Sequence, residues 1–176
     1  MTPSAVPGVS LASGLPTPGR LDPDGFSEVM ASHRIHDLGE VAAYIEAIDF
    51  TDLKRSMSTR PGGLSWPAEQ CDWAEDQYKK WLFLRRKHEN QLLSPNNEID
   101  RFWHEHILDT RAYFRNTARI FGYYQHHFPY FGARGDADLA DLRAVWANTC
   151  RHFRREFGAY PTQFADRPAS AERTST

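Results

Sequence analysis

Histidines and carboxylates gather in residues 99–132, and their spacing predicts a metal site. Four of the eight histidines of the chain lie there, at positions 104, 106, 126 and 127. Apolar residues recur at helical spacing in the first half of this stretch, and a helix turns about 100° per residue. Asp100 and His104 therefore share one face, whereas His106 lies roughly 200° around the helix from His104. A turn after Gly122 brings His127 back toward that helix, so we predict that Asp100, His104 and His127 bind a metal ion.

The predicted ligand set indicates what chemistry the site would perform. Two histidines and one carboxylate leave coordination positions open for a substrate or for oxygen; iron is typical of this set, and copper, manganese and zinc are alternatives. His106 and His126 are then candidate catalytic residues, as acid/base groups or as hydrogen-bonding partners of the ligands. Tyr113 shares the face of His106 and is the third candidate, as a donor of a hydrogen bond or a proton. We expect a metal-dependent, oxidoreductase-like enzyme acting on a small molecule.

Two alternatives use the same residues differently. If the helix is distorted at Glu105, His106 replaces Asp100 and the site forms on the face of Tyr113. If the histidines are structural, they hold the loop 122–132 in place through buried hydrogen bonds. The chain would then be a non-catalytic helical interaction module, contacting a protein partner through exposed aromatic side chains. These aromatic residues are Tyr123, Tyr124, Tyr130 and Phe131.

Short motifs between Tyr78 and Gly132 follow one another in a recognisable order. They are Leu82-Phe83-Leu84, Leu93-Ser94-Pro95, Ile99-Asp100, Trp103-His104-Glu105-His106, Thr110 with Tyr113, Phe121-Gly122 and His127-Phe128-Pro129. This order resembles the glycine-rich domain-containing protein-like family. The chain lacks the glycine-rich tail of that family's larger members and so resembles a short, stand-alone form. The resemblance supports the histidine site without naming a reaction, and the stand-alone form favours a small enzyme.

Composition excludes several classes of function. A hydrophobic content of 40% indicates a globular protein, and a net charge of −2 gives no general attraction to nucleic acid or anionic membranes. No apolar run approaches the roughly 20 residues that span a bilayer. Cys71 and Cys150 form no C-x-x-C motif, and no signal-peptide pattern opens the chain, so we expect a cytoplasmic protein. Neither a nucleophilic serine motif nor a phosphate-binding loop is present. The expected partner is a small-molecule substrate, and a homo-oligomer is left open.

Helical periodicity and the lack of strand-like alternation predict an all-α protein. We expect a single compact domain of four to five helices over residues 25–161, between disordered arms at 1–24 and 162–176. Pro67 begins one helix, and Asp136 caps the last one. The histidine-bearing helix ends at Gly122, with a break near Asp109, and the last helix ends at Gly158.

Overall fold

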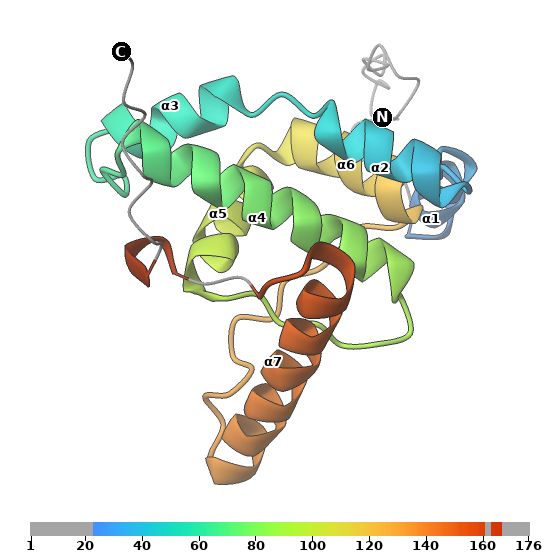
Figure 1. Ribbon diagram of the computed structural model, residues 1–176. Helices are drawn as coiled ribbons and strands as arrows, with labels where there is room; N and C mark the ends of the chain where they lie inside the picture. The colour runs from blue at the N-terminus through green and yellow to red at the C-terminus, as the bar shows by residue number, and fades with distance from the viewer. Residues whose placement is uncertain (1–22, 161–162, 167–176) are drawn as a thin grey trace, which may run out of the picture. The chain divides into compact units, whose positions relative to one another are not determined.

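The computed structural model describes residues 23–160 and 163–166, which form only helices, turns and loops (Figure 1). The elements are α1 (Pro23–Ser32), α2 (Leu38–Glu46), α3 (Thr51–Thr59), α4 (Ala68–Lys87), α5 (Asn97–Leu108), α6 (Thr110–Phe121), α7 (Asp136–Phe157) and the 3-10 helix η1 (Phe164–Asp166). The predicted all-α class is confirmed, but four to five helices was too few. None of the helices in the described part is both long and apolar enough to cross a membrane. The predicted disordered arms lie outside the described residues, except for residues 23–24 and 163–166.

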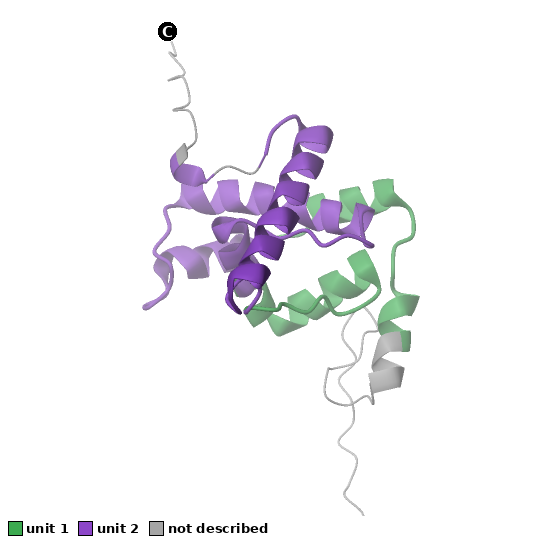
Figure 2. Cartoon of the chain, turned by 90° about the horizontal axis from the view of Figure 1, so that it is seen from below, with its two compact units in different colours: residues 1–49, 105–129 green, residues 50–104, 130–176 purple. Residues whose placement is uncertain are grey.

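The chain divides into two compact units, shown in different colours in Figure 2. Unit 1 consists of residues 1–49 and 105–129, and unit 2 of residues 50–104 and 130–176. Helices α1, α2 and α6 belong to unit 1, whereas α3, α4, α7 and η1 belong to unit 2. Each unit thus combines two segments that are far apart in the sequence.

Unit 1 is built around α6, which packs against both α1 and α2. Met30 of α1 joins Phe114 and Ala118 of α6 in a cluster whose members are completely buried. The positive φ of 77° at Gly122 ends α6, as predicted, and its N–H is donated to carbonyl groups of the last helical turn. The Arg34 guanidinium also donates a hydrogen bond to the Phe121 carbonyl, at 3.1 Å. The end of α6 is therefore fixed from both its own backbone and a side chain of another segment.

Asp109 marks the boundary between two helices, α5 and α6. Its carboxylate accepts a hydrogen bond from the Ala112 N–H at 3.2 Å, so it caps a new helix that begins at Thr110. The apolar pattern continues across Asp109, but the helical conformation does not. The predicted break therefore separates α5 from α6. α1 is a helix of 10 residues and adds to the number that we expected.

Unit 2 has an aromatic core that fixes the orientation of the first part of α5. Phe102 packs edge-on against Phe50, with ring centroids 5.2 Å apart, and lies 5.3 Å from Tyr78. Trp103 lies 4.8 Å from Trp81, centroid to centroid. Ile99 shares the buried face of α5 with Phe102 and Trp103. Because these three residues face the core, the remaining side of α5 is left to polar residues.

The start of α7 is held by Asp138 rather than by the predicted cap at Asp136. Asp136 is the first helical residue and Gly135 occupies the cap position without a side-chain hydrogen bond. The Asp138 carboxylate accepts hydrogen bonds from the Gly132 N–H at 2.6 Å, from the Arg134 N–H at 3.1 Å and from the Arg134 guanidinium at 2.6 Å. The hydrogen bond from Arg134 lowers the pKa of Asp138. One carboxylate thus ties the preceding loop to α7.

Candidate metal centre

Asp100 and His104 occupy successive turns on the polar side of α5. Asn96 caps this helix, since its side-chain carbonyl accepts the Ile99 N–H at 2.8 Å. Asp100 Oδ2 lies 3.6 Å from His104 Nε2, and the two side chains are 33% and 48% exposed. An exposed pair of this kind contributes about 0–1 kcal/mol to stability. The pair therefore adds little to the stability of the fold, and both groups remain open to solvent.

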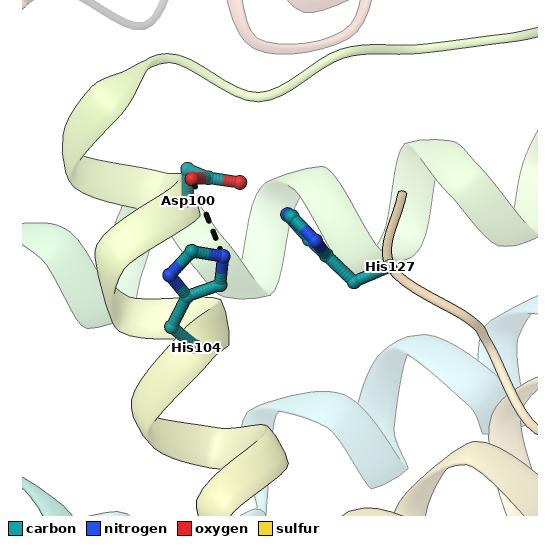
Figure 3. Close-up of side chains that lie close together, drawn as sticks. All are labelled: Asp100, His104 and His127. Atoms are coloured by element: carbon teal, nitrogen blue, oxygen red, sulfur yellow. Dashed lines mark ion pairs between the residues drawn. The ribbon is translucent and has the colours of Figure 1, made fainter. Parts of the chain in front are cut away.

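His127, the third predicted ligand, belongs to unit 1, whereas Asp100 and His104 belong to unit 2; Figure 3 draws the three side chains. The donor set, two imidazole nitrogens and one carboxylate, fits a divalent transition metal. The structure pairs Asp100 with His104 within unit 2, and metal binding by these two residues together with His127 of unit 1 stays a prediction.

His106 is placed apart from this group. Its side chain is 1% exposed, and its Nε2 lies 3.0 Å from Asn116 Nδ2. The Asn116 side-chain carbonyl in turn accepts a hydrogen bond from the Tyr44 hydroxyl at 2.9 Å. Burial, with a smaller contribution from the positive charge of Arg115, lowers the pKa of His106 to about 3. His106 is therefore neutral near pH 7, and no group of three possible ligands among the described residues includes it.

Tyr113 and His126, the other candidate catalytic residues, both have their rings close to that of Tyr124. The Tyr113 ring is completely buried and lies 5.0 Å from the His106 ring, nearly perpendicular to it. The Tyr113 hydroxyl donates a hydrogen bond to the Gln125 carbonyl. His126 is exposed, and its ring lies 5.0 Å from that of Tyr124. Of the two, only His126 is accessible to a molecule in solution.

Nothing in the sequence pattern singles out Tyr44, Asn116 or Gln125, although Asn116 contacts His106, Gln125 contacts Tyr113, and Tyr44 contacts Asn116. Tyr44 and Asn116 are 72 positions apart, and a polar side chain within an apolar helical pattern gives no sign of its partner. The four aromatic residues expected to form an interaction surface are divided. Tyr123 and Tyr130 are 40% and 62% exposed, whereas Tyr124 and Phe131 are partly buried.

Comparison with known proteins identifies the family and corrects the expected one. The model of the UCP032817-like family matches residues 41–163, well over half of the chain, so the protein belongs to this family. The assignment to the glycine-rich domain-containing protein-like family was wrong. It depended on short motifs of two to four residues, whereas the family model spans four helices upstream of the histidine turn and the helix after it. Neither the curated proteins nor the solved structures gave a match.

Proposed function

We propose that this member of the UCP032817-like family is a metal-dependent enzyme that acts on a small molecule, with Asp100, His104 and His127 as its metal ligands. One observation carries the proposal: Asp100 Oδ2 lies 3.6 Å from His104 Nε2 on the exposed side of α5, so a carboxylate oxygen and an imidazole nitrogen are both open to an ion. Because the chain belongs to a different family, the resemblance to a short, stand-alone form no longer supports an enzyme. The proposal therefore rests on the donor set and its geometry.

The nature and exposure of the ligands favour a catalytic ion over a purely structural one. Structural zinc sites are usually closed by four protein ligands, while three ligands leave positions for substrate. Asp100 and His104 keep a third to a half of their side-chain surface exposed, so a small molecule can approach them. Two histidines and one carboxylate are the ligand set of non-haem iron enzymes, and an iron(II) ion bound there would supply oxidative chemistry.

The remaining candidate residues take different parts in this proposal. His126 is exposed and adjacent in sequence to His127, which suits a group that exchanges a proton with a bound substrate. His106 and Tyr113 are too deeply buried for this role, at 1% and 0% exposure. They act on the site only through the residues that they contact.

Metal analysis of protein purified without a polyhistidine tag tests the proposal. We expect about one transition-metal ion per chain, and a lower melting temperature after chelation, because a ligand that binds only the folded state stabilises it. His104→Ala and His127→Ala should each abolish stoichiometric metal. His126→Ala, which removes the neighbouring imidazole, is the matched control and should retain it.

A protein without bound metal, with the same melting temperature in the presence and absence of chelator, would reject the proposal. The same holds if His126→Ala and His127→Ala lose metal equally, since the ion would then not be selected by the geometry at His127. The histidines would in that case serve the fold, and the exposed Tyr123 and Tyr130 would become the surface to test against protein partners.

A further inference from the structure

The segment that carries His127 is tied to α6 by one buried side chain. Tyr113 is 0% exposed, and its hydroxyl donates a hydrogen bond to the backbone carbonyl of Gln125. Gln125 precedes His127 by two residues, which span at most about 7 Å of backbone. A bond to this carbonyl therefore restricts where the backbone of His127 can lie.

The Tyr113 ring is itself fixed by its neighbours in unit 1. It lies edge-on to the His106 ring, with centroids 5.0 Å apart and an interplanar angle of 89°. The Tyr124 ring lies 5.2 Å away on a similarly perpendicular plane, and Tyr124 packs on the cluster that contains Met30 and Phe114. Aromatic pairs favour this edge-to-face arrangement. The hydroxyl is consequently held in one direction.

His106 is held in turn, and in one tautomer. An amide nitrogen can only donate, so Nε2 of His106 accepts from Asn116 and the ring proton is on Nδ1. The Tyr44 hydroxyl, bonded to the carbonyl oxygen of Asn116, fixes the orientation of the amide. These contacts connect α2, α5 and α6 through the buried His106 and Asn116 and the partly buried Tyr44, and such a hydrogen-bonded chain gives rigidity.

From these contacts we infer that Tyr113, supported by His106, is a positioning residue: its hydroxyl fixes the backbone at Gln125 so that His127 is presented as a metal ligand. The inference rests on the proposed metal site and adds to it the device that places one ligand. Neither side chain is accessible to substrate, so Tyr113 acts on His127 through the 125–127 segment, and His106 supports it through the Tyr113 ring.

Cobalt(II), whose visible spectrum reports on its ligands, is a suitable probe of the first consequence. Tyr113→Phe removes the hydroxyl and keeps the ring. We expect its Co²⁺ dissociation constant to rise by about 10- to 100-fold, the usual effect of losing a group that orients a ligand. Tyr124→Phe is the matched control, since it removes the same hydroxyl from the ring that packs against Tyr113. The Tyr124 hydroxyl makes no hydrogen bond to another described residue. Equal affinities of the two variants would overturn the inference.

A double-mutant cycle separates positioning from general loosening of the fold. If Tyr113 acts through His127, Tyr113→Phe should not weaken the residual Co²⁺ binding of His127→Ala, measured at millimolar Co²⁺. A merely structural role for Tyr113 would weaken binding by the same factor in both backgrounds, and that result would overturn the inference.

Nuclear magnetic resonance without metal distinguishes failure of the inference from failure of the proposed function. Loss of the Tyr113 hydroxyl should lower the amide order of residues 125–127 and shift the His127 imidazole signals, and Tyr124→Phe should leave both as in the wild type. If the wild type binds no Co²⁺ but Tyr113→Phe frees the segment, the metal site is rejected and the positioning of the segment stands. If the segment stays ordered in Tyr113→Phe, the inference is rejected whether or not metal binds.

Discussion

The imidazole rings of His88 and His152 lie 3.9 Å apart, tilted by 40°, where the end of α4 meets α7. His152 is also bonded through Nε2 to the Gln91 side-chain carbonyl at 2.9 Å. Partial burial lowers the pKa of both rings. Nearby positive charges lower the pKa of each ring further: His152 and Lys87 act on His88, and Arg151 and Arg155 act on His152. The Glu156 carboxylate raises both pKa values.

We predict that this pair makes the protein less stable in mild acid. Both pKa values are lower in the folded than in the unfolded protein, so the unfolded state binds more protons below about pH 6.5 and stability falls as the pH decreases. His152→Gln should flatten the dependence of melting temperature on pH between 7.5 and 5.5. Identical slopes for this variant and the wild type would contradict the prediction.

The unfolding free energy should depend on pH more steeply because of His106 than because of the His88–His152 pair, and this dependence should continue to lower pH. Its folded pKa of about 3 means that the wild type loses up to about 1.4 kcal/mol of unfolding free energy per pH unit below pH 6.5. Urea unfolding at pH 7, 6, 5 and 4.5 should show this loss, and His106→Gln should reduce it by about that amount. His126→Gln, which removes an exposed imidazole, is the control and should retain the slope set by His106. Parallel profiles for His106→Gln and the wild type would show that His106 is not held neutral by the fold.

Gly132 should tolerate a methyl group less well than Gly135. Both have positive φ, of 90° and 108°, so an alanine at either position is strained. A Cβ at position 132 would also lie 2.4 Å from Leu142 Cδ2, whereas one at position 135 meets nothing within 4 Å. We expect Gly132→Ala to lower the unfolding free energy by about 1–3 kcal/mol more than Gly135→Ala, the usual cost of overpacking. Leu142→Ala removes Cδ2 and keeps Cβ, which would lie 3.3 Å from the added methyl group, so in this background the difference should become smaller; an unchanged difference would exclude the clash with Cδ2 as its cause.

Removal of the Asp109 cap should lower the unfolding free energy by the contribution of one hydrogen bond. Asp109→Ala should cost about 1 kcal/mol, since the Ala112 N–H then lacks its side-chain acceptor. Asp109→Asn keeps a side-chain oxygen at the cap and should cost much less. Chemical unfolding of the two variants provides the comparison, and equal losses would mean that the charge, not the hydrogen bond, is what α6 requires.

Local features of the fold could be predicted from the sequence because their causes are local. Gly122 and Gly158 end helices through positive φ, which few other residues adopt. Asp100 and His104 face the same way because four residues make nearly one helical turn. The break at Asp109 was foreseen as a position, but whether a cap hydrogen bond would form there depends on the backbone around it.

Features that join distant segments could not be predicted in this way. The His88–His152 pair and the hydrogen bond between Tyr44 and Asn116 connect positions more than 60 residues apart. Helical periodicity predicts which face of the helix carries His106. It does not predict whether a hydrogen-bond donor or acceptor from another helix is buried next to that face. Short motifs also misassigned the family, since they represent few of the positions that specify this fold.

The paired hydrogen bonds of Asn116 have a consequence for natural variation within the family. An apolar residue at position 106 would remove the acceptor of the Asn116 amide, and an apolar residue at 116 would remove the acceptor of the Tyr44 hydroxyl and the donor to His106 Nε2. A change at any one position is thus costly until the other two have followed. Positions 44, 106 and 116 are therefore expected to co-vary, with relatives carrying either the full polar set or an apolar replacement of all three.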